Sequence, residues 1–164
     1  RSLNPRRTVG QSIVEGPINF GVSAHKAWQR AENLMELVRL RPDALHRYPS
    51  EFSGGQRQRL CIARALACEP KVLIADEAVS ALDVSVQDQI LKLLREIQER
   101  LSLGILFITH DLRVASNICD QLIVMHKGRV VERGLARDIL LNPQQDYTRS
   151  LLAAAPGQHW TFHS

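Results

Sequence analysis

Apolar residues recur along this chain in two patterns that point to different secondary structure. In three stretches, 24–41, 54–68 and 84–101, they return every three or four positions, which predicts amphipathic helices. In two short stretches, 72–75 and 105–109, almost every position is apolar, which is typical of strands covered on both faces of a sheet. Helices and strands therefore alternate, and this order predicts right-handed crossovers, a mainly parallel sheet and an α/β fold.

Local signals mark where these elements begin and end. Ser23, Ser53 and Asp83 precede the three helices as candidate N-caps, and Pro42 and Pro70 stop the first two helices. Weaker patterns predict a loop with one short helix at 1–22, a connector at 45–49, a short helix at 114–118, a hairpin of 121–126 and 129–132, and terminal helices at 135–141 and 147–155.

Composition narrows the class of protein only a little. The chain has 164 residues, 45% of them hydrophobic, which suits one domain with a substantial core. The net charge of +4 is compatible with nucleic acid, an anionic membrane or a nucleotide, and it selects none of them because the basic residues are scattered. Three cysteines without C-x-x-C spacing indicate reduced thiols in the cytosol.

The two ends of the sequence carry little targeting information. No apolar run approaches the roughly 18 residues that a membrane-spanning helix needs. The chain starts at Arg1 with a polar segment and without an initiator methionine, which predicts a position inside a longer protein. The last residues, 157–164, carry no recognisable signal.

An acidic pair, Asp76-Glu77, follows the first predicted strand. Adjacent side chains at a strand end point to different sides, so one carboxylate can hold Mg²⁺ while the other faces a reacting phosphate and orients a water. An acidic pair at the start of a loop is the plain alternative. The four apolar strand residues before the pair favour the functional interpretation.

Two further elements suit phosphate chemistry. Ser53-Gly54-Gly55-Gln56 opens a helix, where free backbone N–H groups and a close glycine approach favour an anion. The alternative is a glycine-rich helix cap. His110 follows the second strand, where ligand-facing residues collect in open α/β sheets, although a capping or core histidine is the alternative there.

One apparent phosphate loop is excluded. Gly16 and Gly21 have the spacing of a P-loop, but Val22-Ser23 stands where Lys-Ser/Thr is required and no strand precedes them. The 164 residues contain no G-x-x-x-x-G-K-[ST] sequence.

Four motifs occur in a fixed order, namely Phe52-Ser53-Gly54-Gly55-Gln56, Leu73-Ile74-Ala75-Asp76-Glu77, Ser80-Ala81-Leu82-Asp83 and His110. They resemble the signature, the Walker B segment with its catalytic Glu, the D-loop and the switch histidine of the nucleotide-binding subunit of ATP-binding cassette (ABC) transporters. Phe52 stands in the usual Leu place. The resemblance covers essentially the whole chain.

Three further segments resemble one branch of this family, the importers of oligopeptides and dipeptides, which includes nickel and glutathione importers. They are Ser2-Leu3-Asn4-Pro5-Arg6 with Thr8-Val9, then Arg47-Tyr48-Pro49, and Tyr147-Thr148-Arg149-Ser150-Leu151-Leu152. The tail segment is the most branch-specific, because the common core of the family lacks it.

The resemblance implies a partial P-loop NTPase fold with a helical signature subdomain. Residues 1–70 would end the helical subdomain, 71–134 would form the RecA-like core, and 135–164 would be the helical extension of the branch. Two such domains, identical or homologous, would sandwich two ATP and energise a transmembrane permease at the cytoplasmic face of the inner membrane. A substrate-binding protein would act indirectly, and nucleic acid would not be a partner.

The family roles carry over residue by residue. Asp76 would help hold Mg²⁺, Glu77 would be the general base, and His110 would contact the γ-phosphate. The remaining nucleotide-binding positions lie in the signature and the D-loop: Ser53, Gly54, Gly55 and Gln56, which would cap the partner's ATP in trans, and Ser80 and Asp83.

The chain departs from the family in two ways. Ala78-Val79 replaces the usual Pro-Thr, which we expect to loosen Glu77 modestly. The Walker A, adenine-stacking and Gln loops are missing, so we expect an exposed sheet edge and no ATP hydrolysis by this polypeptide alone. A fragment, a pseudogene product and a working short protein all stay open.

Two alternative functions also stay open. One is a non-catalytic module that supplies only the signature face in trans. The other is a soluble cassette ATPase acting on ribosomes or DNA, against which the tail segment and the lack of added basic or coiled-coil segments count. The sequence does not name the cargo.

Overall fold

The computed structural model describes residues 3–155, so Ser2 of the branch segment and the tail 157–164 lie outside the described residues. The chain divides into two compact units, 1–106 and 107–164, each of which is described by itself. The three-part organisation expected from the resemblance stays a prediction.

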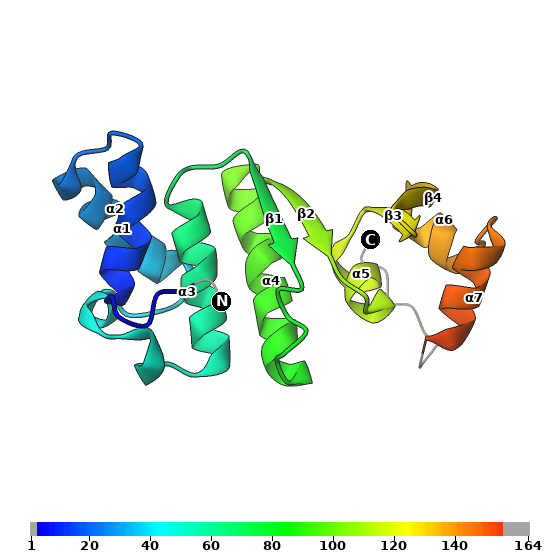
Figure 1. Ribbon diagram of the computed structural model, residues 1–164, viewed down its shortest axis with the longest axis horizontal. Helices are drawn as coiled ribbons and strands as arrows, with labels where there is room; N and C mark the ends of the chain where they lie inside the picture. The colour runs from blue at the N-terminus through cyan, green and yellow to red at the C-terminus, as the bar shows by residue number, and fades with distance from the viewer. Residues whose placement is uncertain (1–2, 156–164) are drawn as a thin grey trace. The chain divides into compact units, whose positions relative to one another are not determined.

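The first unit begins with a group of helices that pack on one another (Figure 1). They are α1 (Val9–Asn19), α2 (Ala24–Leu37), the 3₁₀ turns η1 (Pro42–His46) and η2 (Pro49–Glu51), and α3 (Gly54–Leu66). Each α-helix starts at a hydroxyl N-cap, Thr8, Ser23 or Ser53, whose side chain accepts a hydrogen bond from the helix backbone. The caps predicted at Ser23 and Ser53 are confirmed.

Helix α1 is longer than the glycine and proline content of residues 1–22 suggested. It spans 11 residues, with a capping box between Thr8 and Gln11, and it contains Pro17. Gly16 also lies inside it, where an added Cβ would come within 2.7 Å of the Cys68 Sγ. This glycine serves close packing, which agrees with the exclusion of a P-loop here.

Helix α2 ends at Leu37, before the predicted stop at Pro42. Arg39 has a left-handed φ of 60°. The Leu40 N–H donates to the Met35 carbonyl at 2.8 Å and the Arg39 N–H to the Glu36 carbonyl at 2.9 Å. This is the Schellman pattern, which closes a helix by its own backbone bonds, so the proline is not needed to stop it.

The strands β1 (Val72–Asp76) and β2 (Gly104–Ile108) lie side by side in a two-stranded parallel sheet, and α4 (Val84–Leu101) connects them. The predicted cap at Asp83 is confirmed, since its Oδ1 accepts from the Val86 N–H at 3.0 Å. Helix α4 lies beside α3 (Figure 1). The apolar spacing predicts a buried stripe of Val86, Ile90, Leu93, Leu94, Ile97 and Leu101. The four middle residues are buried, together with Leu91, whereas Val86 is half-buried and Leu101 is 47% exposed.

Strand β1 differs from the expectation of cover on both faces. Leu73 and Ala75 are buried, but the alternate residues Val72 and Ile74 are 59% and 63% exposed. Successive side chains of a strand point to opposite faces, so within the described residues only one face of β1 is covered. The apolar run correctly indicated a strand, and it was wrong about the cover.

The second unit is a hairpin packed against short helices. After α5 (Leu112–Ile118), strands β3 (Gln121–His126) and β4 (Arg129–Leu135) pair in antiparallel register. Lys127 and Gly128 both have positive φ, 49° and 75°, as the tight turn of a two-residue hairpin requires. The predicted hairpin is confirmed, with β4 longer than expected, and α6 (Ala136–Leu141) and α7 (Asp146–Ala154) follow.

The tail segment, residues 147–152, lies in α7 and helps to hold this helix against the hairpin. Tyr147 stacks on His126 of β3, with ring centroids 3.9 Å apart and planes 9° apart. The Glu132 carboxylate on β4 accepts from the N–H groups of Gln144 at 2.8 Å and Gln145 at 3.3 Å. The chain leading into α7 is therefore held by a side chain from the hairpin, which gives the tail segment a structural role.

Candidate functional site

The Ser53 loop forms a closed capping box at the start of α3. The Gln56 N–H donates to the Ser53 Oγ at 3.3 Å, and the Ser53 N–H donates to the Gln56 Oε1 at 2.9 Å. Ser53, Gly54 and Gln56 are nevertheless exposed within the first unit. The loop is thus rigid and accessible, as a surface that meets a phosphate from outside must be.

The two glycines of this loop face the segment that opens α4. A Cβ added to Gly55 would lie 2.5 Å from the Val86 Cγ1, and one added to Gly54 would lie 3.6 Å from the Leu82 Cδ2. Sequence reasoning assigned both glycines to the approach of a phosphate and missed Val86. No local signal marks this contact, because it joins two helices separated by a strand.

The acidic pair lies where the first strand ends. Asp76 is the last residue of β1, and both Asp76 and Glu77 are exposed. Glu77 has a left-handed φ of 49°, which is uncommon for a non-glycine residue and costs about 1–3 kcal/mol unless its surroundings hold it. Arg39, Glu69, Ser102 and Lys127 have the same conformation at or near helix ends and in the hairpin turn, so at Glu77 it marks the sharp turn that follows β1.

A tight turn holds the Glu77 backbone. Its carbonyl accepts from the Ser80 Oγ at 3.1 Å and from the Ser80 N–H at 3.4 Å. Val79, which stands where the family has Thr, is 2% exposed and anchors the turn in the core. Ser80 and Asp83 therefore both shape the backbone between β1 and α4.

His110 belongs to the second unit and follows β2. It is exposed, and its flanks are fixed: the Asp111 N–H donates to the Thr109 Oγ1 at 3.0 Å, and Asp111 caps α5 through the Arg113 N–H at 2.9 Å. The side-chain hydrogen bond from Arg113 holds the pKa of the Asp111 carboxyl below its ordinary value. His110 lies in the second unit and the pair Asp76-Glu77 in the first, and each is described within its own unit.

The donor set fits Mg²⁺ in one specific way. Within residues 3–155, no three His, Cys, Asp or Glu side chains cluster as a metal site. Mg²⁺ usually takes one or two carboxylates and completes its shell with water and substrate phosphates, so a single exposed Asp76 suits a metal that arrives with a nucleotide.

None of the described helices is long and apolar enough to cross a membrane.

These features are those of an α/β domain consistent with part of a P-loop NTPase, and comparison with known proteins shows which family the chain resembles. The sequence model of the ABC transporter family matches residues 1–80. A Brucella ovis protein named as a peptide import ATP-binding protein is 50% identical over 156 residues, covering 94% of this chain and 49% of that protein. The glutathione import ATP-binding protein GsiA of Salmonella typhi is 53% identical over 94% of this chain and 25% of its own length.

A solved structure gives the same result at the level of the fold. It is described as an inward-facing conformation of a metal-chelate type ABC transporter, and it superposes with a TM-score of 0.75 at 28% identity, over 85% of this chain and 57% of that one. By these comparisons the chain is similar to the ATP-binding proteins of the ABC transporter family. It spans about half the length of the Brucella relative and a quarter of that of GsiA.

Proposed function

We propose that this chain is part of the ATP-binding, ATP-hydrolysing subunit of an ABC importer for peptides or related small solutes of the dipeptide, oligopeptide, nickel or glutathione type. The observation that carries the proposal is the sequence identity to proteins named for peptide and glutathione import, which is 50% and 53% over 94% of the chain. The chemistry of the exposed motif residues supports it.

The proposed roles follow from the positions of the side chains in each unit. Asp76, exposed at the end of β1, would hold Mg²⁺, and Glu77 beside it would orient the attacking water. His110, exposed after β2, would contact the γ-phosphate. Each of these roles needs a triphosphate that brings the groups together.

The Ser53 loop supports a role in trans. The Ser53 and Gln56 N–H groups donate within the capping box, but the first turn of α3 is exposed, so Ser53, Gly54, Gly55 and Gln56 would cap the γ-phosphate of an ATP held by a second ATPase domain. Ser80 and Asp83 would contribute by shaping the neighbouring turn. The partner domain, identical or homologous, and the permease would place the assembly at the cytoplasmic face of the membrane.

A nucleotide-dependent association assay tests this role. The purified chain is mixed with the full-length Brucella ovis relative, with Mg²⁺ and a non-hydrolysable ATP analogue or with no nucleotide, and the complex is measured by sedimentation. We expect association only with the nucleotide. Gly54→Asp places a negative charge where the phosphate would sit and should abolish it, while leaving the fold intact because Gly54 has ordinary space.

Gly128→Asp is the matched control. Gly128 lies in the hairpin turn of the second unit with nothing within 4 Å of an added Cβ, and Asp is among the non-glycine residues that adopt a positive φ most often, so the strain there is small. It should associate like the unchanged chain. Association that ignores the nucleotide, or that Gly54→Asp leaves intact, would contradict the proposed role of the loop.

A further inference from the structure

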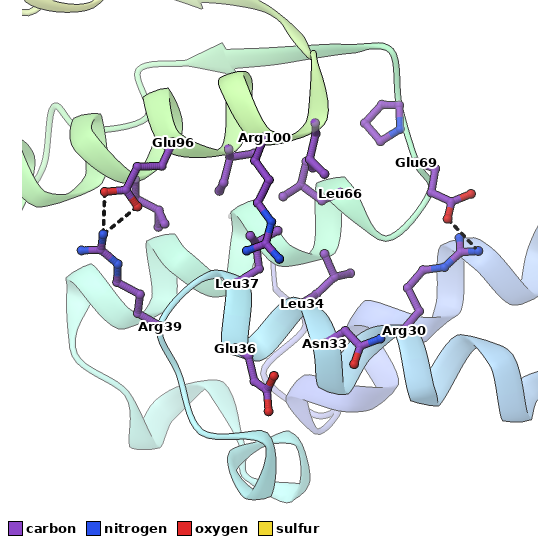
Figure 2. A pocket seen from close by; sticks show the side chains of 14 residues that line it. Arg30, Asn33, Leu34, Glu36, Leu37, Arg39, Leu66, Glu69, Glu96 and Arg100 are labelled. Carbon is purple, nitrogen blue, oxygen red and sulfur yellow. Dashed lines mark hydrogen bonds and ion pairs between the residues drawn. The ribbon is translucent and has the colours of Figure 1, made fainter.

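A hollow of about 820 Å³ lies in the first unit, between α2, the end of α3 and the last turns of α4 (Figure 2). Its floor is apolar and is made by Leu34, Leu66, Leu93 and Ile97. The Ser53 loop is at the opposite end of α3, about 20 Å away along a helix of this length. The hollow therefore belongs to none of the motifs described above.

Ion pairs fix two sides of this hollow. Arg39 binds both carboxylate oxygens of Glu96 at 2.6 Å, and Arg30 pairs with Glu69 at 3.0 Å. The Arg30 guanidinium also donates to the Ala67 carbonyl at 2.8 Å. These four charged groups neutralise one another in pairs. They shape the rim and are not available to bind a charged ligand.

Within the described chain, Arg100 lacks an ion-pair partner, unlike Arg30, Arg39, Glu69 and Glu96 on the same rim. In Figure 2 its guanidinium extends from α4 across the floor toward Leu37, between the two ion pairs. Among residues 3–155, it has neither a hydrogen bond nor an ion pair to any group, and the nearby Glu36 points away from it. Arg100 thus places an unpaired positive charge directly above the apolar floor, while Glu36, a carboxylate of the lining that is likewise unpaired in the part of the chain that the structure describes, is directed away from it.

We propose that this hollow binds a small amphipathic anion, with its apolar body on the leucine floor and its carboxylate paired with Arg100. Ligand sites of this size are lined mainly by apolar side chains with a few polar groups that fix orientation. A guanidinium offers two parallel donors that match a carboxylate. The proposal goes beyond the proposed ATPase role, and neither depends on the other.

The competing explanation for Arg100 is electrostatic. It lies in the last turn of α4, where a cation stabilises the helix dipole without any ligand. That role requires the charge alone and no apolar partner. The two explanations therefore predict different ligand preferences and different effects of the same substitution.

The first test uses the unchanged 164-residue chain and three probes with the same ten-carbon chain: decanoate, decanol and decyltrimethylammonium. Each is titrated into isotope-labelled protein and followed by amide chemical shifts. We expect saturable shifts at Leu34, Leu37 and Leu101 with decanoate, binding about tenfold weaker with decanol, and weaker still with the cation. Equal affinities, or no saturable shift up to ~5 mM decanoate, would overturn the proposal.

The second test uses matched variants on one helix. Arg100→Gln should weaken decanoate about tenfold, and Arg100→Lys should weaken it less. Lys92→Gln is the control, because Lys92 is ion-paired with Asp88 at 2.8 Å on the same helix and does not line the hollow. If Arg100→Gln lowers the melting temperature and leaves decanoate affinity unchanged, Arg100 serves the helix end and the proposed site is wrong.

Discussion

Gly55 lies against Val86, so closely that a single added carbon on Gly55 would come within 2.5 Å of the Val86 Cγ1. This contact joins the first turn of α3, which carries the signature, to the first turn of α4, which follows the D-loop segment. It gives Gly55 a packing role that is separate from any approach to a phosphate. Gly54, one residue earlier, has no such constraint.

Gly55→Ala should therefore destabilise the first unit by about 1–3 kcal/mol, as overpacking does, although alanine is the better helix former. Valine is stiff at χ1 and cannot turn aside cheaply. The free energy of unfolding in urea measures this. Gly54→Ala is the matched control, and we expect no loss from it.

The pairing with Val86 is checked by a double-mutant cycle. Val86→Ala removes the obstructing methyls, so Gly55→Ala should cost much less in that background, with a coupling of about 0.5–3 kcal/mol. Equal costs of Gly55→Ala in both backgrounds would show that Val86 is not the obstacle.

The two faces of β1 should respond differently to truncation. Leu73 is 8% exposed, so Leu73→Ala should cost about 2–5 kcal/mol. Ile74, on the uncovered face, should cost under about 1 kcal/mol when changed to Ala, mostly through lost strand propensity. Urea unfolding of both variants gives the comparison. A similar loss from Ile74→Ala would show that this face is covered in solution.

Acid should release the Glu132 clamp in the second unit. The pKa of the Glu132 carboxyl is lowered, with the Thr148 hydroxyl, the Gln144 N–H and the Gln145 N–H as favourable neighbours. The Thr148 Oγ1 is not in hydrogen-bonding geometry with any described group, so the two backbone N–H groups are the firmer cause.

A carboxyl whose folded pKa is lowered stabilises the fold above its unfolded value and loses that contribution as the pH falls through the folded pKa. The ordinary value for Glu is 4.5, so the stabilisation should be full at neutral pH and should fade below about pH 4.5. Glu132→Gln should lower the melting temperature at pH 7 and make little difference at acid pH. Glu32→Gln, at an exposed position on α2, is the control and should show no such pH-dependent difference.

The chain by itself should not hydrolyse ATP. None of its 164 residues forms a G-x-x-x-x-G-K-[ST] loop, so little would hold the β-phosphate. Phosphate release from the purified chain should equal the buffer background, with Glu77→Gln indistinguishable from it. Activity above background that Glu77→Gln removes would contradict this prediction.

The sequence by itself determined where most helices and strands of this protein begin and end, because those boundaries depend on local chemistry. The caps at Ser53 and Asp83 and the hairpin turn at Lys127-Gly128 are where the pattern places them, because a cap or a tight turn depends on a few neighbouring residues. The motif order likewise indicated the similarity to ABC transporter ATP-binding proteins, since its signal lies in the residues themselves.

Tertiary structure decided which of these side chains are covered and by what. Three features depend on residues distant in sequence: the contact of Gly55 with Val86, the hydrogen bonds of Glu132 to the chain before α7, and the position of Arg100 over an apolar floor. The exposure of one face of β1 likewise depends on which elements pack against it. Apolar spacing shows that a residue can be buried, but the burial itself comes from long-range packing, which no local pattern contains.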